Sequence, residues 1–104
     1  MNIYQLPKLP IPEELTTILA ESKTTRTTKI ERIISTGQTS DWYDQSQTEF
    51  VLLLEGSAEI EFDNKPPATL QKGDYLIILP HERHRVSYTS TTPPCIWLCV
   101  FYAD

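Results

Sequence analysis

The sequence predicts an all-β protein, an antiparallel barrel or sandwich of short strands that follows an N-terminal arm and a short helix. Apolar and acidic residues alternate with a period of two over 58–62, as in a strand with one solvated face. Short apolar or alternating runs recur along the chain, and turn residues separate them at close intervals. Strands this short with turns this frequent are typical of antiparallel sandwiches and barrels.

Strands are expected over 28–35, 50–54, 58–62, 68–71, 75–79, 86–89 and 95–102. The run 75–79 is interpreted as a buried strand, since it is rich in β-branched and aromatic residues and too short for a helix. The run 95–102 is apolar on both faces, so we expect it in the barrel body or in a subunit contact. Its cysteines, Cys95 and Cys99, would lie about 13 Å apart on one face, too far for a disulfide.

The N-terminal segment is expected to be an extended arm followed by a short helix. Three prolines within residues 2–12 each remove a backbone donor, which favours an extended chain. Pro12 suits the first helical position, and Glu13 and Glu14 would complement the helix dipole. Apolar residues then follow at helical spacing, at Leu15, Ile18 and Leu19. The 104 residues therefore form one domain, with the arm and helix over 1–27 and a β-barrel over 28–104.

Composition limits the partners and the location. The formal net charge of −5 argues against nucleic acid and anionic membranes, since both bind basic patches. No apolar run is long enough to span a bilayer. The first residues lack the basic start and apolar core of a signal peptide, so we expect a cytoplasmic protein.

Two spaced motifs in the chain resemble those of the cupins. The first family motif, G-x5-H-x-H-x3-E-x6-G, corresponds to Gly37, Tyr43, Gln45, Glu49 and Gly56. The second, G-x5-P-x-G-x2-H-x3-N, corresponds to Gly73, Leu79, His81, His84 and Tyr88. Segments 31–38, 42–45 and 81–86 look like a group of small, single-domain bacterial cupins of unassigned activity. The resemblance implies an antiparallel cupin barrel, the double-stranded β-helix or jelly roll, and a homodimer.

The chain departs from the family at its metal ligands. Tyr43 and Gln45 replace both motif-one histidines, which leaves Glu49 and His84 of the four usual ligands. A Gln/His/Glu/His set serves zinc in the phosphomannose isomerase branch of the cupins. This likeness implies that Gln45, Glu49 and His84 can hold a divalent metal such as Zn, Mn, Fe or Ni. Without metal, Glu49 and His84 are expected to form a hydrogen-bonded pair, structural or used as catalytic acid and base.

Other residues around these positions have alternative roles. Tyr43, Gln45 and Glu49 share a face in an unbroken strand because even numbers separate them. Tyr43 is expected to be a pocket wall that contacts the bound cofactor or ligand. His81 is either a solvated turn residue or a further donor in the site. Asp44 is expected to tie down the turn, although a bulge that inverted the segment would put it in the place of Gln45.

Two classes of function remain open from the sequence. In the first, an enzyme, the metal would polarise a small oxygenated substrate for isomerase, lyase or oxygenase chemistry. In the second, a metal-free module would bind a small polar ligand such as a sugar or an organic acid. Arg83 and Arg85 either receive an anionic substrate at the mouth of the pocket or form surface ion pairs with residues such as Glu82. Because the fold hosts both classes, it does not decide between them.

Overall fold

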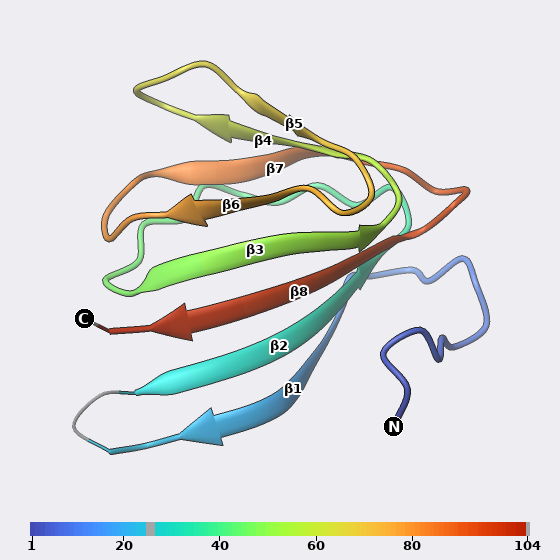
Figure 1. Ribbon diagram of the computed structural model, residues 1–104. Helices are drawn as coiled ribbons and strands as arrows, with labels where there is room; N and C mark the ends of the chain where they lie inside the picture. The colour runs from blue at the N-terminus through green and yellow to red at the C-terminus, as the bar shows by residue number, and fades with distance from the viewer. Residues whose placement is uncertain (25–26, 104) are drawn as a thin grey trace.

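The protein consists of two antiparallel β-sheets that face each other (Figure 1). The computed structural model describes residues 1–24 and 27–103, which contain eight strands and no helix. The larger sheet has the order β1 (Leu15–Ser22), β2 (Thr28–Ser35), β8 (Cys95–Tyr102), β3 (Thr48–Glu55) and β6 (Tyr75–Ile78). The smaller sheet has the order β5 (Ala68–Leu70), β4 (Ala58–Phe62) and β7 (His84–Thr89). The prediction of an all-β antiparallel fold is confirmed.

The segment predicted to be a short helix is strand β1, so that prediction is wrong. β1 pairs antiparallel with β2 along its length, and the β2 edge accepts and donates the hydrogen bonds that a helix would have made internally. Three consecutive β-branched residues, 16–18, also favour a strand. The apolar residues at helical spacing do not pack on a core, since Leu15, Ile18 and Leu19 are each at least 37% exposed.

The hydrophobic core fills the space between the two sheets. Strand β4 shows the predicted alternation, with buried Ala58, Ile60 and Phe62 between half-buried glutamates. The larger sheet contributes the inward residues Val51, Leu53, Ile78, Trp97 and Cys99. Cys95 and Cys99 are both buried free thiols, as expected from their spacing. The core thus separates two sheets, one of which carries Glu49 and the other His84.

The outer face of the larger sheet is apolar as well. β8 lies between β2 and β3, which explains why it is apolar on both faces. β6 lies at the edge, and its outward residues Tyr75 and Ile77 are 65% and 42% exposed. The interpretation of 75–79 as a buried strand is therefore wrong for one of its two faces. An edge strand has a neighbour on one side only, so its outward side chains are less covered than those of a central strand.

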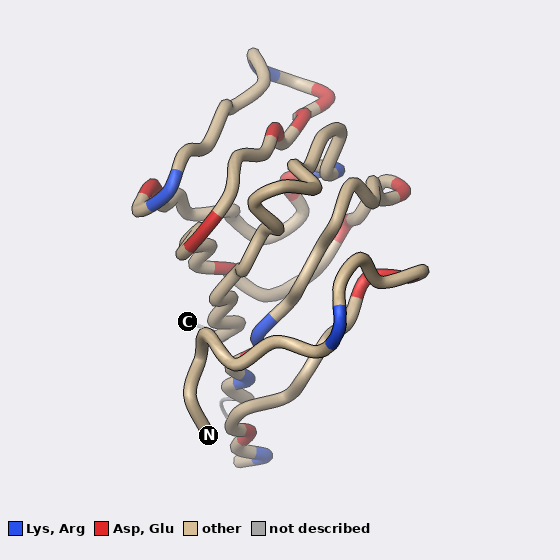
Figure 2. Tube along the Cα trace, turned by 90° about the vertical axis from the view of Figure 1, so that its right-hand side faces the viewer, with Lys and Arg blue, Asp and Glu red and all other residues tan. Residues whose placement is uncertain are grey.

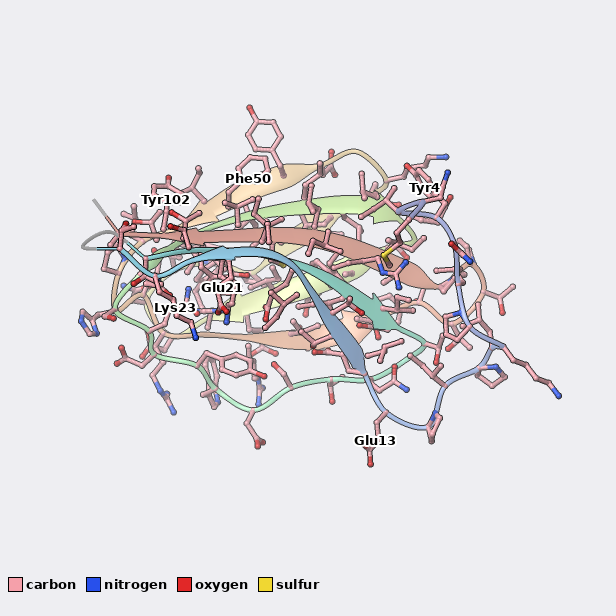
Figure 3. The ribbon with its side chains drawn as sticks, turned by 90° about the horizontal axis from the view of Figure 1, so that it is seen from below. Tyr4, Glu13, Glu21, Lys23, Phe50 and Tyr102 are labelled. Atoms are coloured by element: carbon pink, nitrogen blue, oxygen red, sulfur yellow. The ribbon has the colours of Figure 1, made fainter. Side chains whose placement is uncertain are left out.

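The N-terminal arm covers part of this outer face. The Arg32 guanidinium donates from Nη1 to the carbonyl oxygens of Ile3, at 3.3 Å, and Gln5, at 2.7 Å. In Figure 3, Tyr4 of the arm and Phe50 of β3 lie on the same side of the sheet. The arm covers the end of the sheet near Ile34 and Ile96, which are almost fully buried. The end near Phe50 and Ile77 is left partly exposed.

Acidic and basic residues are interspersed along the trace of the chain (Figure 2). Ion pairs such as Lys65–Glu82, at 2.8 Å, and Lys72–Glu55, at 3.6 Å, join neighbouring turns and strand ends. Exposed pairs of this kind contribute little to stability. In the part of the chain that the structure describes, no helix is long and apolar enough to cross a membrane.

Candidate functional site

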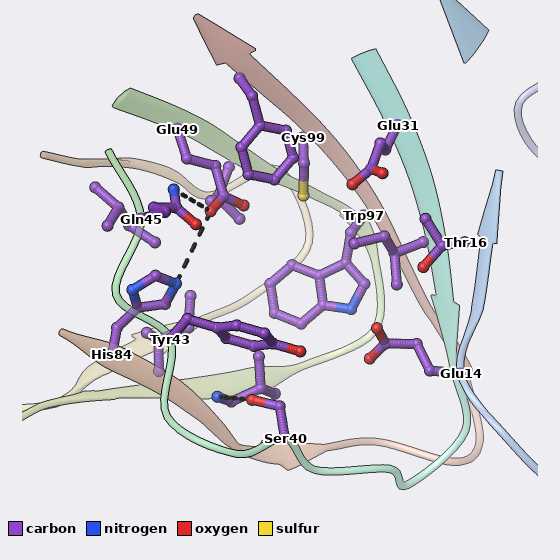
Figure 4. Close-up of a pocket in the computed structure, with 16 residues that line it drawn as sticks. Glu14, Thr16, Glu31, Ser40, Tyr43, Gln45, Glu49, His84, Trp97 and Cys99 are labelled. Carbon is purple, nitrogen blue, oxygen red and sulfur yellow. Dashed lines mark hydrogen bonds and ion pairs between the residues drawn. The ribbon is translucent and has the colours of Figure 1, made fainter. Parts of the chain in front are cut away.

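The candidate site is a pocket between the two sheets (Figure 4). Its volume is about 220 Å³, somewhat below the roughly 300–1,000 Å³ of sites for drug-sized ligands. The apolar part of its wall includes Val51, Ile60, Ile78, Val86 and Trp97. Its polar residues include Glu14, Glu31, Tyr43, Gln45, Glu49 and His84. An apolar cavity with a few converging polar groups is the usual form of a small-molecule site.

The structure brings Glu49 and His84 together inside this pocket. Glu49 lies on β3 and is 7% exposed, and His84 begins β7 and is 5% exposed. The distance from Glu49 Oε1 to His84 Nε2 is 3.9 Å (Figure 4). The two residues come from opposite sheets, so the core between the sheets sets their separation. This distance leaves the facing atoms without a direct hydrogen bond.

The backbone fixes the orientation of the His84 ring. Its Nδ1 lies 2.9 Å from the carbonyl oxygen of Glu82. Because a carbonyl oxygen only accepts, Nδ1 carries a proton and donates it, and in the neutral ring the lone pair is on Nε2. Tyr43 and His84 also exchange two backbone hydrogen bonds, at 2.7 and 3.1 Å. Nε2 of His84 is thus held toward Glu49.

The environment of Glu49 favours the protonated carboxyl more than water does. Burial raises the pKa of Glu49, while the hydrogen bond from Gln45 and the charge of His84 partly offset this effect. Gln45 donates from Nε2 to Glu49 Oε1 at 3.1 Å. Burial and the neighbouring Glu49 also raise the pKa of the Cys99 thiol well above its usual value. Cys99 is therefore a neutral thiol in the pocket wall and a poor nucleophile.

Tyr43 and Gln45 line the pocket, whereas His81 and Asp44 do not. The Tyr43 ring lies 5.7 Å from the His84 ring, centroid to centroid. His81 has a φ of 61°, and its Nδ1 lies 2.7 Å from Asp44 Oδ1 at the surface. Asp44 thus holds the turn of His81, as one of the alternatives expected, and Gln45 is the residue that faces the pocket.

Sequence reasoning missed two acidic residues of the pocket, Glu14 and Glu31. Ser35 Oγ donates to Glu14 Oε2 at 3.5 Å, and Trp97 Nε1 donates to Ser35 Oγ at 3.2 Å. Burial raises the pKa of Glu14, and the charge of Glu31 adds to this effect. Glu31 could have been found from the sequence. It is two residues from Ile33 on β2, so both side chains point to the same face of the strand. Glu14 could not have been found, since the sequence predicts a helix over its segment.

Arg83 and Arg85 do not line this pocket. Both guanidinium groups pack on the Trp42 ring, each with its carbon 4.7 Å from the ring centroid. Arg85 pairs with Glu61 at 3.1 Å, and Arg83 lies 3.9 Å from Asp63. Both arginines therefore form surface ion pairs, which is one of the two roles expected for them. Their partners are Glu61 and Asp63, and not Glu82.

The residues present fit a divalent metal in part. In residues 1–24 and 27–103, no three His, Cys, Asp or Glu side chains converge as ligands. Glu49 and the unprotonated Nε2 of His84 are suitable donors, and the amide of Gln45 is a third polar group beside them. The 3.9 Å between Oε1 and Nε2 is shorter than the roughly 4.2 Å that two zinc–ligand bonds add up to. One ion could contact both atoms, with fewer strong protein ligands than most metal sites supply.

Fold and pocket together define an antiparallel β-barrel protein with a polar pocket inside the barrel. The chain belongs to the cupin family, because the family model described as "Cupin domain" matches residues 31–101. The recognition of a cupin from its two motifs is therefore confirmed.

Solved structures show the same relationship. The chain is 38% identical to a protein from Ralstonia eutropha JMP134 that is provisionally named a mannose-6-phosphate isomerase, with a TM-score of 0.91 over 100% of this chain and 97% of that one. A cupin superfamily protein from Desulfitobacterium hafniense DCB-2 is 20% identical, with a TM-score of 0.78 over 94% and 84%. The polyketide cyclase RemF from Streptomyces resistomycificus is 16% identical, with a TM-score of 0.72 over 89% and 67%. The last two show the fold alone. No curated protein matches the chain.

Proposed function

We propose that the pocket binds a small polar molecule and that Glu49 and His84 transfer protons to and from it. One observation carries the proposal: a buried carboxyl and the unprotonated nitrogen of a buried imidazole face each other across 3.9 Å. Two titratable groups in different environments are the usual arrangement for an acid and a base that act together. The raised pKa of Glu49 suits it to the role of acid, and His84 Nε2 suits that of base.

The reaction class that fits this pair begins with removal of a proton from carbon next to a carbonyl. His84 Nε2 takes the proton, and the C–H electrons form a carbon–carbon double bond as the carbonyl oxygen becomes negative. Glu49 gives its proton to that oxygen. For an isomerisation, His84 returns its proton to the former carbonyl carbon, and Glu49 takes the proton of the hydroxyl on the deprotonated carbon, which becomes the new carbonyl. For an elimination, Glu49 takes back the enol proton, the carbonyl re-forms and the leaving group departs from the β carbon with the electron pair of its bond. The provisional name of the 38% identical protein supports the first outcome.

Proton exchange with solvent tests this proposal without knowledge of the product. Small aldoses, ketoses and 2-oxo acids are incubated with the protein in D₂O, and NMR reports deuterium at carbon. We expect exchange with at least one compound, and a loss of roughly 10²–10⁴-fold in rate in Glu49→Gln and in His84→Asn. Glu13→Gln, an exposed position outside the pocket, serves as the control. A rate that neither pocket substitution lowers would contradict the proposal, and binding without exchange would support a metal-free binding module instead.

A divalent metal is the second candidate, favoured by the His84 tautomer. Glu49, His84 and Gln45 would hold it, and Zn, Mn, Fe or Ni would polarise an oxygen of the bound molecule. Elemental analysis of the purified protein tests this candidate. Stoichiometric metal that is lost in both Glu49→Ala and His84→Ala would support it. Wild-type protein that stays metal-free after incubation with each of the four ions would exclude it.

We also propose that the protein is a homodimer that pairs through the outer face of its larger sheet. One row across this face is apolar from β2 to β6, formed by Ile30, Val100, Phe50 and Ile77. Tyr75 and Ile77 are exposed at its end, and Phe50 and Tyr75 stack with ring centroids 5.4 Å apart. Exposed apolar surface of this kind is typical of subunit contacts.

A charge placed on this face is expected to separate the subunits. Ile77→Lys would bury an unpaired ammonium in the contact, so the dimer dissociation constant is expected to rise by roughly a hundredfold or more. Ile18→Lys is the matched control, because Ile18 is similarly exposed but lies on β1, at the opposite edge of the sheet from β6. Analytical ultracentrifugation measures both. Wild-type protein that sediments as a monomer, or an unchanged Ile77→Lys dimer, would contradict the proposal.

A further inference from the structure

The pocket has acidic side chains at more than one place. Glu14, Glu31 and Glu49 line it, and among the described residues no lysine or arginine does. Lys29 contacts Glu31 from the rim, with Nζ 3.3 Å from Oε2, and its Nζ also lies 4.8 Å from the centre of the Phe101 ring. Arg32 points to the opposite face of the sheet, where it binds the N-terminal arm. Among the residues that the structure describes, His84 is the one side chain of the pocket lining that can become cationic.

The carboxylates lie at two different ends of the pocket. Figure 4 shows Glu49 and His84 on one side and Glu14 on the other, with Trp97 and Tyr43 between them. The hydroxyl of Tyr43 points toward the Glu14 side. The charge of Glu14 contributes to raising the pKa of Tyr43, after burial. A molecule in the pocket can therefore meet Glu49 and His84 at one end and Glu14 at the other.

Glu14 is held by a buried chain of hydrogen bonds. Ser35 is fully buried and Trp97 is 4% exposed, and both contribute polar groups to a chain that ends on Glu14. Trp97 donates to Ser35, and Ser35 donates to the carboxylate. Buried polar groups need such partners, so the Ser35 hydroxyl and Glu14 restrain each other. Glu14 is itself exposed, but the bond from Ser35 holds its carboxylate at the wall of the pocket, whereas Glu13 does not line the pocket.

We propose that Glu14 determines ligand charge, so that the pocket accepts a molecule with an amine at the end away from Glu49 and His84 and rejects a phosphorylated one. This inference rests on the proposed function for the end of the ligand that reacts. A phosphate carries about −1.5 to −2 charges at neutral pH, and proteins bind it with arginine, lysine or helix N-termini. The described residues place none of these in the pocket. The preferred ligand therefore differs in charge from a mannose 6-phosphate.

Three sugars that share the mannose ring and differ in charge at carbon 6 test the inference. They are D-mannose, 6-amino-6-deoxy-D-mannose and D-mannose 6-phosphate, and the reporter is the fluorescence of Trp97. A Trp42→Phe background leaves Trp97 as the single tryptophan. We expect the amine to bind tightest and the phosphate weakest. In Glu14→Gln, affinity for the amine is expected to fall roughly tenfold to a hundredfold, while Glu13→Gln keeps the original order.

Two controls separate this inference from the proposed function. High salt is expected to narrow the differences among the sugars, because they are electrostatic. The order should persist in Glu49→Gln, even though proton exchange is lost there. Equal or tighter binding of the phosphate, an unchanged order in Glu14→Gln, or no binding of the amine up to its solubility limit would each overturn the inference. Wild-type protein that binds the sugars in this order but shows no proton exchange with any compound would leave the inference standing and refute the proposed function alone.

Discussion

Glu49→Gln protein, kept metal-free with a chelator, is expected to be more stable than wild type at neutral pH by about 0.5–2 kcal/mol. Glu49 is 7% exposed, and its burial in the charged form is unfavourable. Glutamine has nearly the same shape, and its carbonyl oxygen can still accept the hydrogen bond from Gln45. The substitution thus removes a buried charge and keeps the packing, while it also removes the acid of the proposed reaction.

The stability difference between Glu49→Gln and wild type is expected to grow as pH rises. The pKa of Glu49 is raised in the folded state, so the folded state holds the proton to higher pH than the unfolded state does. Wild-type stability from this group is fully present below the ordinary glutamate pKa and is lost as pH rises through the folded-state pKa. Thermal unfolding across that pH range should show that Glu49→Gln is more stable than wild type at neutral pH and equally stable in acid. A variant less stable than wild type at neutral pH, with Glu13→Gln unchanged, would contradict this account.

Gly56→Ala is expected to be strongly destabilising, by roughly 2–5 kcal/mol. Gly56 follows β3 with a φ of 91°, a conformation that disfavours a side chain. A Cβ there would lie 2.6 Å from the carbonyl oxygen of Pro94 and 2.9 Å from Cys95 Sγ. The first of these atoms is backbone and cannot move without shifting the start of β8. Urea unfolding would measure the loss.

Gly73 provides a matched control for the steric part of this effect. Its φ of 89° is nearly the same, but a Cβ there would meet nothing within 4 Å. Gly73→Ala should therefore show only the backbone cost, about 1–2 kcal/mol. The difference between the two variants isolates the contact with Pro94 and Cys95. Equal losses of stability in both variants would show that the backbone at Pro94 moves aside without a cost in free energy.

Part of the site could be predicted from residue spacing. The even separations among Tyr43, Gln45 and Glu49 placed them on one face, and all three line the pocket. The second motif supplied His84, which meets Glu49 from the other sheet. Spacing works here because a strand alternates its faces with a fixed period. His81 shows the limit of such reasoning from spacing. It lies in a turn, where side chains do not alternate with a fixed period, and it does not line the pocket.

Glu14 shows what spacing could not supply. Its segment has apolar residues at helical intervals, and its preference for a strand depends on β2 as a partner. β2 follows β1 directly in the chain, but their hydrogen bonds form only when the two segments pair. The local signals disagreed, because the apolar spacing favoured a helix and the β-branched run 16–18 a strand. Once β1 joins the sheet, Glu14 comes to the pocket and is bound by Ser35. The charge of the pocket therefore followed only from the folded structure.

The chain alone was sufficient to predict the cupin fold, seven of the strands and the pair of residues at the centre of the site, because alternation and motif spacing are local properties. Only the tertiary structure decided that the first strand is not a helix and which acidic side chains share the pocket. It also decided which apolar residues stay exposed on the outer sheet. These outcomes depend on which strands lie side by side, and strand pairing is a long-range choice.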